Sequence, residues 1–257
     1  LPRRYSSDHG GSAYIAADPV SEGRYGEFAR EILTAADADV DFGAFDNDGP
    51  DGEPNSGDDD GFVDYVFLNL RSTPQRFLIG RATGIAALGM EGDFNTADRA
   101  AGGGVIRISG TAGFGAIQRE TSLAVAVGSM AHEFGHALGL PDLFDRSFLT
   151  DNSQAPAQDS AGIGHWGLMG WGATGWYGND GPAPLSAWSR QRLGWLTTNN
   201  GRLVQVTGDT SDVVVQDVQT GGAIVRVPLP PEPSTRASVE QGYLLLEQRV
   251  RSSYYNR

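Results

Sequence analysis

Two histidines and a glutamate near the middle of the chain have the types and spacing that metal-dependent chemistry needs. His132 and His136 lie four residues apart with Glu133 beside the first, after an apolar run from Thr121 to Ala131 that favours a helix. Side chains four apart share one helix face, so both imidazoles can hold one Zn²⁺. Glu133 lies one step round the helix, where it can act as general base on a water molecule activated by the metal.

The residues after His136 favour a third metal ligand close by. Gly139 can adopt a left-handed conformation that ends the helix, and Pro141 prevents the helix from resuming. The resulting bend lets Asp142, six residues after His136, turn back as an oxygen ligand. Glu247 is a distant carboxylate that competes for the same role.

A second group of candidate ligands lies in the acidic, glycine-rich stretch from Asp46 to Asp64. It begins D-N-D-G and ends D-G-F-V-D, which resembles the two ends of a calcium loop with an insertion between them. Clustered carboxylates repel one another unless a cation neutralises them, and Ca²⁺ prefers oxygen ligands. The alternative is a solvated acidic turn. The predicted ligands are Asp46, Asp48, Asp60 and Asp64, with Asp58 as a substitute.

The composition narrows the classes of partner. A chain of 257 residues with 39% hydrophobic content can bury one sizeable core. A net charge of -13 argues against nucleic acid or an anionic membrane, because both repel an acidic surface. No apolar run is long enough to span a bilayer, so we expect no membrane insertion. The absence of Cys excludes a thiolate zinc ligand.

Hydrophobic periodicity predicts the elements that must position these residues. We expect a helix from Tyr25 to Ala36 with one buried stripe, the active-site helix from Gln118 to Leu138, and a short helix from Pro184 to Leu193. The predicted strands are Val63–Leu70, Phe77–Ile79, Ile85–Leu88, Val105–Ile108, Leu203–Val206, Val213–Val215, Ala223–Val227 and Tyr243–Val250.

Several further motifs accompany the segment H-E-F-G-H-A-L-G-L-P-D. They are G-H-W-G-L-M-G-W-G from Gly164, L-S-A-W from Leu185, L-G-W from Leu193, the acidic stretch above, and Y-L-L-L-E-Q-R from Tyr243. With them the chain resembles the immune inhibitor A family of secreted metallopeptidases, which are metzincin-like enzymes with the signature HExxHxxGxxD. The matches are spread from about Asp41 to Arg249.

The resemblance implies an α+β fold with the two lobes of a metzincin-like zinc peptidase. Residues 1–257 would form a single catalytic domain, cut from a longer precursor. An upper lobe, about 1–139, would hold a twisted, mainly parallel sheet, a backing helix, the active-site helix and the calcium loop 46–64. A smaller lower lobe, about 140–257, would hold the Met-turn and additional C-terminal strands. An edge strand for an extended substrate is expected between residues 71 and 115, in a piece that the pattern does not identify.

The resemblance also implies roles for three residues outside the ligand set. Met169 would be the methionine of the Met-turn and would form a hydrophobic floor under the metal. Asp145 would accept a hydrogen bond from a ligand histidine or tie down its loop, unless it is a cap. His165 is either a helper that stabilises the oxyanion or a structural histidine.

The function that follows is a secreted, extracellular zinc endopeptidase that hydrolyses peptide bonds in protein substrates. Zn²⁺ would be catalytic, Ca²⁺ structural, and an inhibitory pro-segment would keep the enzyme as a zymogen. Two alternatives are a catalytically silent metal-binding module of the same fold and a zinc hydrolase of non-peptide substrates. The intact Glu133 argues against a silent module, because loss of the base is the simplest way to lose activity.

Overall fold

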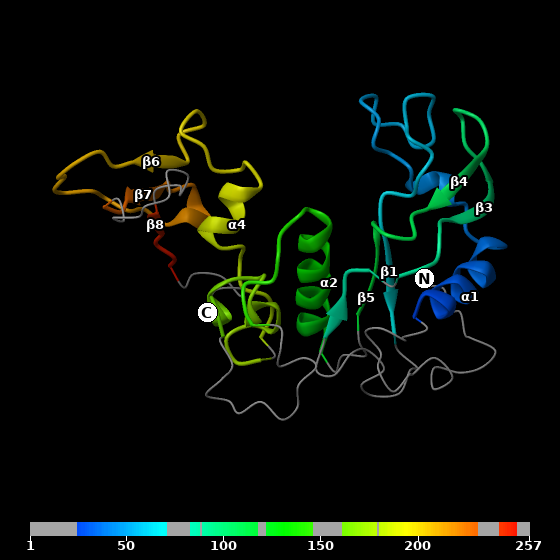
Figure 1. Cartoon of the computed structure of the whole chain (residues 1–257), viewed down its shortest axis with the longest axis horizontal. Coiled ribbons are helices and arrows are strands. Elements are labelled where there is room, and N and C mark those ends of the chain that lie inside the picture. The colour runs from blue at the N-terminus through cyan, green and yellow to red at the C-terminus, as the bar shows by residue number, and fades with distance from the viewer. Residues whose placement is uncertain are drawn as a thin grey trace, which may run out of the picture.

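Helix α2 (Leu123–Ala137) lies in the middle of the molecule in the computed structural model (Figure 1). The elements that precede it in sequence lie on one side, and the C-terminal elements lie on the other. The structure describes residues 25–70, 83–87, 89–117, 122–145, 161–178, 180–230 and 242–250. The strand predicted at Phe77–Ile79 falls outside these residues.

The part before α2 is built from one helix and two small sheets. Helix α1 (Tyr25–Asp37) buries Phe28, Ala29, Ile32, Leu33 and Ala36, the stripe that its periodicity predicts. This stripe belongs to the largest hydrophobic core of the described residues, with the hairpin of β3 (Phe94–Arg99) and β4 (Val105–Ile108). The short 3-10 helix η2 (Phe42–Phe45) leads into the acidic loop.

The second sheet of this part lies against α2. Its order is β1-β5-β2, with β1 (Val66–Asn69) parallel to β5 (Phe114–Ile117) and β2 (Gly84–Ile85) antiparallel to it. We expected a mainly parallel sheet, but the described strands do not form one. Their pairings are mixed, because short connections such as the turn between β3 and β4 favour antiparallel neighbours.

The part after α2 begins with two 3-10 turns and ends in a third sheet. The turns η3 (Gly164–Trp166) and η4 (Trp171–Thr174) flank Met169, and η4 packs directly on α2. The third sheet has the order β6-β7-β8 and packs with α4 around a small core. Its elements are α4 (Ala187–Arg192), β6 (Leu203–Gln205), η5 (Val218–Thr220), β7 (Ile224–Pro228) and β8 (Tyr243–Leu246).

One strand prediction in this part is wrong. Residues Val213–Val215 form no strand, and the side chain of Val214 is 79% exposed. A run of valines favours a strand only where a neighbouring strand covers it, and no described strand does so here.

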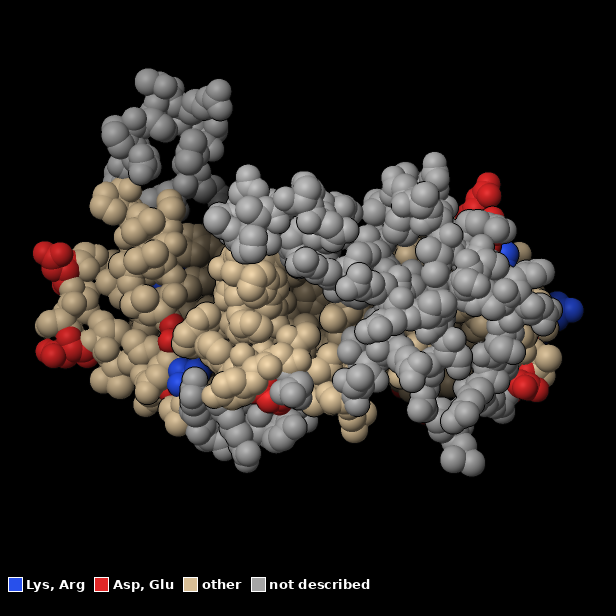
Figure 2. All heavy atoms as spheres, turned by 90° about the horizontal axis from the view of Figure 1, so that it is seen from below, with Lys and Arg blue, Asp and Glu red and all other residues tan. Residues whose placement is uncertain are grey.

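The surface agrees with the acidic composition. Figure 2 shows acidic side chains at both ends of the face that it draws, with fewer basic ones. Among the described residues no helix is both long and apolar enough to cross a membrane.

Candidate metal centre

The two ends of α2 are built from capping signals in the sequence. Ser122 accepts a hydrogen bond from the amide of Val125 and caps the first turn. At the other end Gly139 has φ +86, and the amides of Gly139 and Leu140 donate to the carbonyls of His136 and Gly135. This is the Schellman pattern of a helix stop. It reverses the chain directly after the second histidine, as the sequence predicts.

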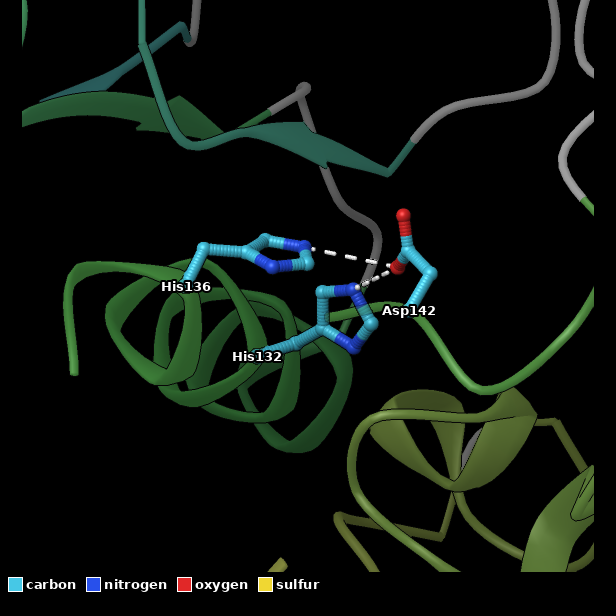
Figure 3. A group of neighbouring side chains, drawn as sticks. All are labelled: His132, His136 and Asp142. Carbon is cyan, nitrogen blue, oxygen red and sulfur yellow. Dashed lines mark hydrogen bonds and ion pairs between the residues drawn. The ribbon is translucent and has the colours of Figure 1, made fainter. Parts of the chain in front are cut away.

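The reversal brings Asp142 back to both histidines. Asp142 Oδ1 lies 3.0 Å from His132 Nε2 and 3.3 Å from His136 Nε2. Figure 3 shows the two imidazoles rising from α2 and pointing toward this carboxylate. The three side chains form a group whose potential ligand atoms all lie within 4.8 Å of one another.

This donor set fits a tetrahedral Zn²⁺. Ligand atoms about 2.0–2.1 Å from a tetrahedral ion lie about 3.3 Å from one another, close to the separations seen here. His132 Nδ1 donates to the carbonyl of Leu168 at 2.7 Å, and His136 Nδ1 donates to that of Leu140 at 2.8 Å. A carbonyl only accepts, so both Nε2 atoms present a lone pair to the centre of the group. Two imidazoles and one carboxylate leave a fourth position for water or substrate.

The electrostatics favour a cation at the same place. Burial by itself raises the pKa of Asp142, but hydrogen bonds and charge from both histidines outweigh it and hold that pKa well below its usual value. Burial lowers the pKa of His136, but its bonds to Asp142 and to the Leu140 carbonyl, with nearby carboxylate charge, leave it raised. The attraction that favours a proton among these groups also favours a divalent cation.

Met169 lies beneath the group as a fully buried side chain. A Cβ at Gly135 would lie 2.5 Å from Met169 Sδ, so the glycine between the two histidines makes room for the methionine. The carbonyl of Met169 accepts from the amide of Leu143, which ties the loop that carries Asp142 to this turn. Met169 thus packs against α2 between the two histidines, and its role as the floor of the metal site stays a prediction.

Glu133 follows His132 on α2 and is only 5% exposed. A Cβ at Gly84 would lie 2.5 Å from Glu133 Oε1, so the carboxylate packs directly on the backbone of β2. Tyr65 lies nearby, and burial together with the charge of Glu133 raises its pKa to about 12. Glu133 is therefore a buried carboxylate beside the ligands and next to the edge strand of the sheet.

A family model, the immune inhibitor A peptidase M6 catalytic domain, matches residues 4–203. The chain belongs to this family. The resemblance read from the motifs is confirmed, and the chain is a metallopeptidase whose His132, His136 and Asp142 can hold the metal. Comparisons with curated proteins and with solved structures found no match.

The remaining residues that we predicted for the site of this M6 peptidase lie outside the ligand group. His165 lies in η3 between the rings of Trp171 and Trp176, at centroid distances of 5.9 and 6.4 Å. Asp145 lies partly buried in the loop after Asp142. The roles suggested for these two residues stay predictions.

Glu247, the competing ligand, pairs instead with two arginines. Its carboxylate lies 2.5 Å from Arg190 and 2.7 Å from Arg249. Both of its oxygens are engaged there, so the structure favours Asp142 as the carboxylate of the metal group.

The acidic loop gathers a second group, Asp46, Asp48 and Asp60. Asp64 lines a cavity of about 440 Å³ together with Asp48 and Asp60. Asp58 is fully exposed and accepts from Ser56, which lowers its pKa, and it does not belong to the group.

Asp59 is a further carboxylate of this loop that the sequence pattern did not single out. Asp59 accepts from the amides of Gly49 and Ser56 and holds the loop closed.

Asp46 is the buried member of the acidic group, with 1% of its surface exposed. Its Oδ1 is buried without a hydrogen-bond partner in the described part of the chain. Burial first, and then the charges of Asp59, Asp60, Asp48 and Asp64, together raise its pKa to about 6.

Proposed function

We propose that this M6 metallopeptidase is a zinc-dependent endopeptidase with Glu133 as its general base. The observation that carries the proposal is the three-donor group, in which one carboxylate oxygen lies 3.0 and 3.3 Å from two imidazole nitrogens and all three atoms lie within 4.8 Å of one another. Two neutral imidazoles and one carboxylate suit Zn²⁺ better than Ca²⁺ or Mg²⁺, which prefer oxygen ligands.

The metal and Glu133 would have different roles in the reaction. Bound zinc would supply Lewis acidity, lowering the pKa of a water molecule and polarising the scissile carbonyl. Glu133 takes the proton of the attacking water on its carboxylate and passes it to the leaving amine. The packing of Glu133 against Gly84 keeps that carboxylate beside the edge strand, where a substrate backbone can reach it.

Strand β2 is the element that we assign to substrate binding. Among the described strands it is the outer one in the order β1-β5-β2, and it lies against α2 beside Glu133. An extended peptide can add to such an edge through main-chain hydrogen bonds. The backbone would then bind with little dependence on sequence, as an endopeptidase requires.

The acidic group would hold a structural Ca²⁺. The support is the unpartnered, buried Oδ1 of Asp46 among mutually repelling carboxylates. Oxygen ligands at 2.3–2.6 Å around a calcium ion would remove that repulsion and satisfy the buried oxygen. The group lies at the base of the acidic loop, so we assign the ion a structural role.

Casein hydrolysis tests the proposal. The wild-type protein should cleave casein, a chelator should abolish cleavage, and added zinc should restore it. Glu133→Gln should lower kcat/KM by about 10²–10⁴-fold, the usual contribution of a general base, while the protein still binds one zinc. A variant that keeps more than a tenth of the activity would rule out Glu133 as the base.

The same assay separates the two alternatives. A protein that binds zinc and cleaves no peptide would support a silent module or a hydrolase of another substrate. Membership of a peptidase family favours peptide hydrolysis over both.

Export from the cell and an inhibitory pro-segment complete the proposal. The support for both is the resemblance to secreted metallopeptidases. Recovery of the native protein only inside cells would refute export. A full-length precursor as active as residues 1–257 would refute inhibition.

A further inference from the structure

A partly buried charge cluster links the third sheet to the turn that carries Met169. Glu247 bridges Arg190 of α4 and Arg249, at 2.5 and 2.7 Å. The side chains of Arg190, Glu247 and Arg249 are only 15, 19 and 11% exposed. Partly buried groups that carry two positive charges and one negative charge need a further reason to be together, because burial of charge costs free energy.

The other hydrogen bonds of Arg249, which it donates to two backbone carbonyls, supply this reason. Its Nη1 donates to the carbonyl of Trp166 at 2.5 Å, and its Nη2 donates to that of Leu185 at 3.4 Å. These carbonyls belong to two segments that also meet directly, where the amide of Leu168 donates to the carbonyl of Pro184 at 3.1 Å. Arg249 therefore clamps both segments beside that bond.

The clamped segment carries the acceptor that orients a metal ligand. The carbonyl of Leu168 accepts from His132 Nδ1, and Met169 follows directly under the histidines. Trp166 is two residues before Leu168, so a shift of the Trp166 carbonyl moves the turn that holds the acceptor. One continuous path thus runs from Glu247 through Arg249 and Trp166 to His132.

We propose that Arg249 is a positioning residue for the metal centre, aligned by Glu247, and that it holds the Leu168 carbonyl where it fixes the tautomer of His132. This inference rests on the proposed zinc site. It adds a contribution from residues beyond 203, where the family match ends. Arginine suits the task, because its planar fork donates from two separate nitrogens to two carbonyls and a carboxylate, whereas a lysine has a single ammonium nitrogen.

Zinc affinity and the Nδ1–H signal of His132 provide the test. Arg249→Met should weaken zinc binding about ten-fold, the lower end of the loss usual for residues that orient metal ligands. Arg249→Lys should restore part of the affinity. In the zinc-loaded protein, ¹⁵N spectra of the imidazoles should show one sharp Nδ1–H signal of His132 in the wild type, the tautomer that binds the metal through Nε2, and exchange-broadened signals in Arg249→Met.

Arg202→Met is the matched control. Arg202 also donates to a backbone carbonyl at the third sheet, that of Gly221, away from the turn under the metal. Its loss should leave the zinc affinity and the His132 signal unchanged. Should Arg249→Met fail to fold, Glu247→Gln decides the matter, since it keeps the arginine and removes its alignment.

The outcomes are distinguishable. A folded Arg249→Met with the zinc affinity and His132 signal of the control overturns the inference and leaves the proposed function intact. A wild-type protein that binds no zinc overturns the proposed function and this inference with it. A broadened His132 signal together with weaker binding, restricted to the Arg249 and Glu247 variants, supports the inference.

Discussion

Asp142 differs from the other two residues of the metal group because it brings a negative charge. The carboxylate lies within 3.3 Å of both imidazoles and is held ionised by them. A divalent cation bound to two neutral imidazoles and this carboxylate keeps a net charge of about +1. The charge of Asp142, more than its shape, should therefore determine how tightly the metal is held.

Asp142→Asn tests this at the scale of one residue. The amide keeps the size of the side chain and one oxygen, but it removes the charge. Zinc binding, measured by competition with a chromophoric chelator, should weaken by more than the about 10–100-fold expected for loss of an orienting residue. Casein cleavage should require correspondingly more zinc.

Asp209→Asn is the control, because Asp209 is an exposed carboxylate outside the metal group and outside the acidic group. Like Asp142→Asn, it removes one negative charge from the protein. Equal zinc affinity of the two variants would show that Asp142 is not a ligand.

At the scale of the element, the stop of α2 couples stability to metal binding. Gly139 has φ +86, a conformation that costs an L-residue with a side chain about 1–2 kcal/mol. Gly139→Ala should therefore lower the free energy of unfolding by about that amount, measured by urea denaturation. It should also weaken zinc binding, because the turn delivers both the Leu140 carbonyl and Asp142 to the site.

Gly201→Ala separates the two effects. Gly201 has φ +70, and like Gly139 it has open space where a Cβ would lie. It therefore carries the same backbone penalty in a turn away from the metal group. Its unfolding free energy should fall similarly while its zinc affinity stays that of the wild type. Loss of zinc affinity in both variants would contradict a specific role for the turn at Gly139.

The elements around the site differ in how far their sequence predicts them. Helix α2 ends at Ala137, within one residue of the predicted Leu138, because Gly139 is a strong stop signal, but it begins at Leu123 after the Ser122 cap and not at the predicted Gln118. Strand β5, Phe114–Ile117, was not predicted, although it is the central strand of its sheet. Its Gly115 is required because a Cβ there would lie 2.7 Å from the hydroxyl of Tyr65. A strand in which a glycine lets a neighbouring group approach closely lacks the β-branched pattern by which a strand is predicted from its sequence.

The same limit applies within the site. The spacing of His132, His136 and Asp142 predicts their meeting, because all three lie on one helix and the turn that follows it. The carbonyl of Leu168, which orients His132, could not be predicted, since every residue has a carbonyl and only the fold selects one. The pairing of Glu247 with Arg190 had no local signal either, because the two are 57 residues apart.

At the scale of the whole molecule, the protein has a net charge of -13. In the acidic loop, repulsion between carboxylates opposes folding, and a bound cation would offset it. Asp46 has its pKa raised to about 6 in the folded protein, above its value in the unfolded chain. The folded state therefore binds the proton more readily. Without a cation, Asp46 costs nothing at pH below the unfolded value, its cost grows as the pH rises from 3.8 to about 6, and the full cost is present above about 6.

Asp46→Asn removes that cost together with the calcium ligand. In calcium-free buffer with zinc present and no chelator, the Tm of the variant should match the wild type near pH 4 and exceed it by about 2–4 °C near pH 7.5, as expected for about 1 kcal/mol in a chain of this size. Millimolar calcium should raise the wild-type Tm at pH 7.5 and leave the variant unchanged. Asp51→Asn, in the same loop but outside the group, should keep the calcium response. A wild-type Tm that ignores calcium would show that the loop is a solvated acidic turn, because an ion that binds only the folded state must stabilise it.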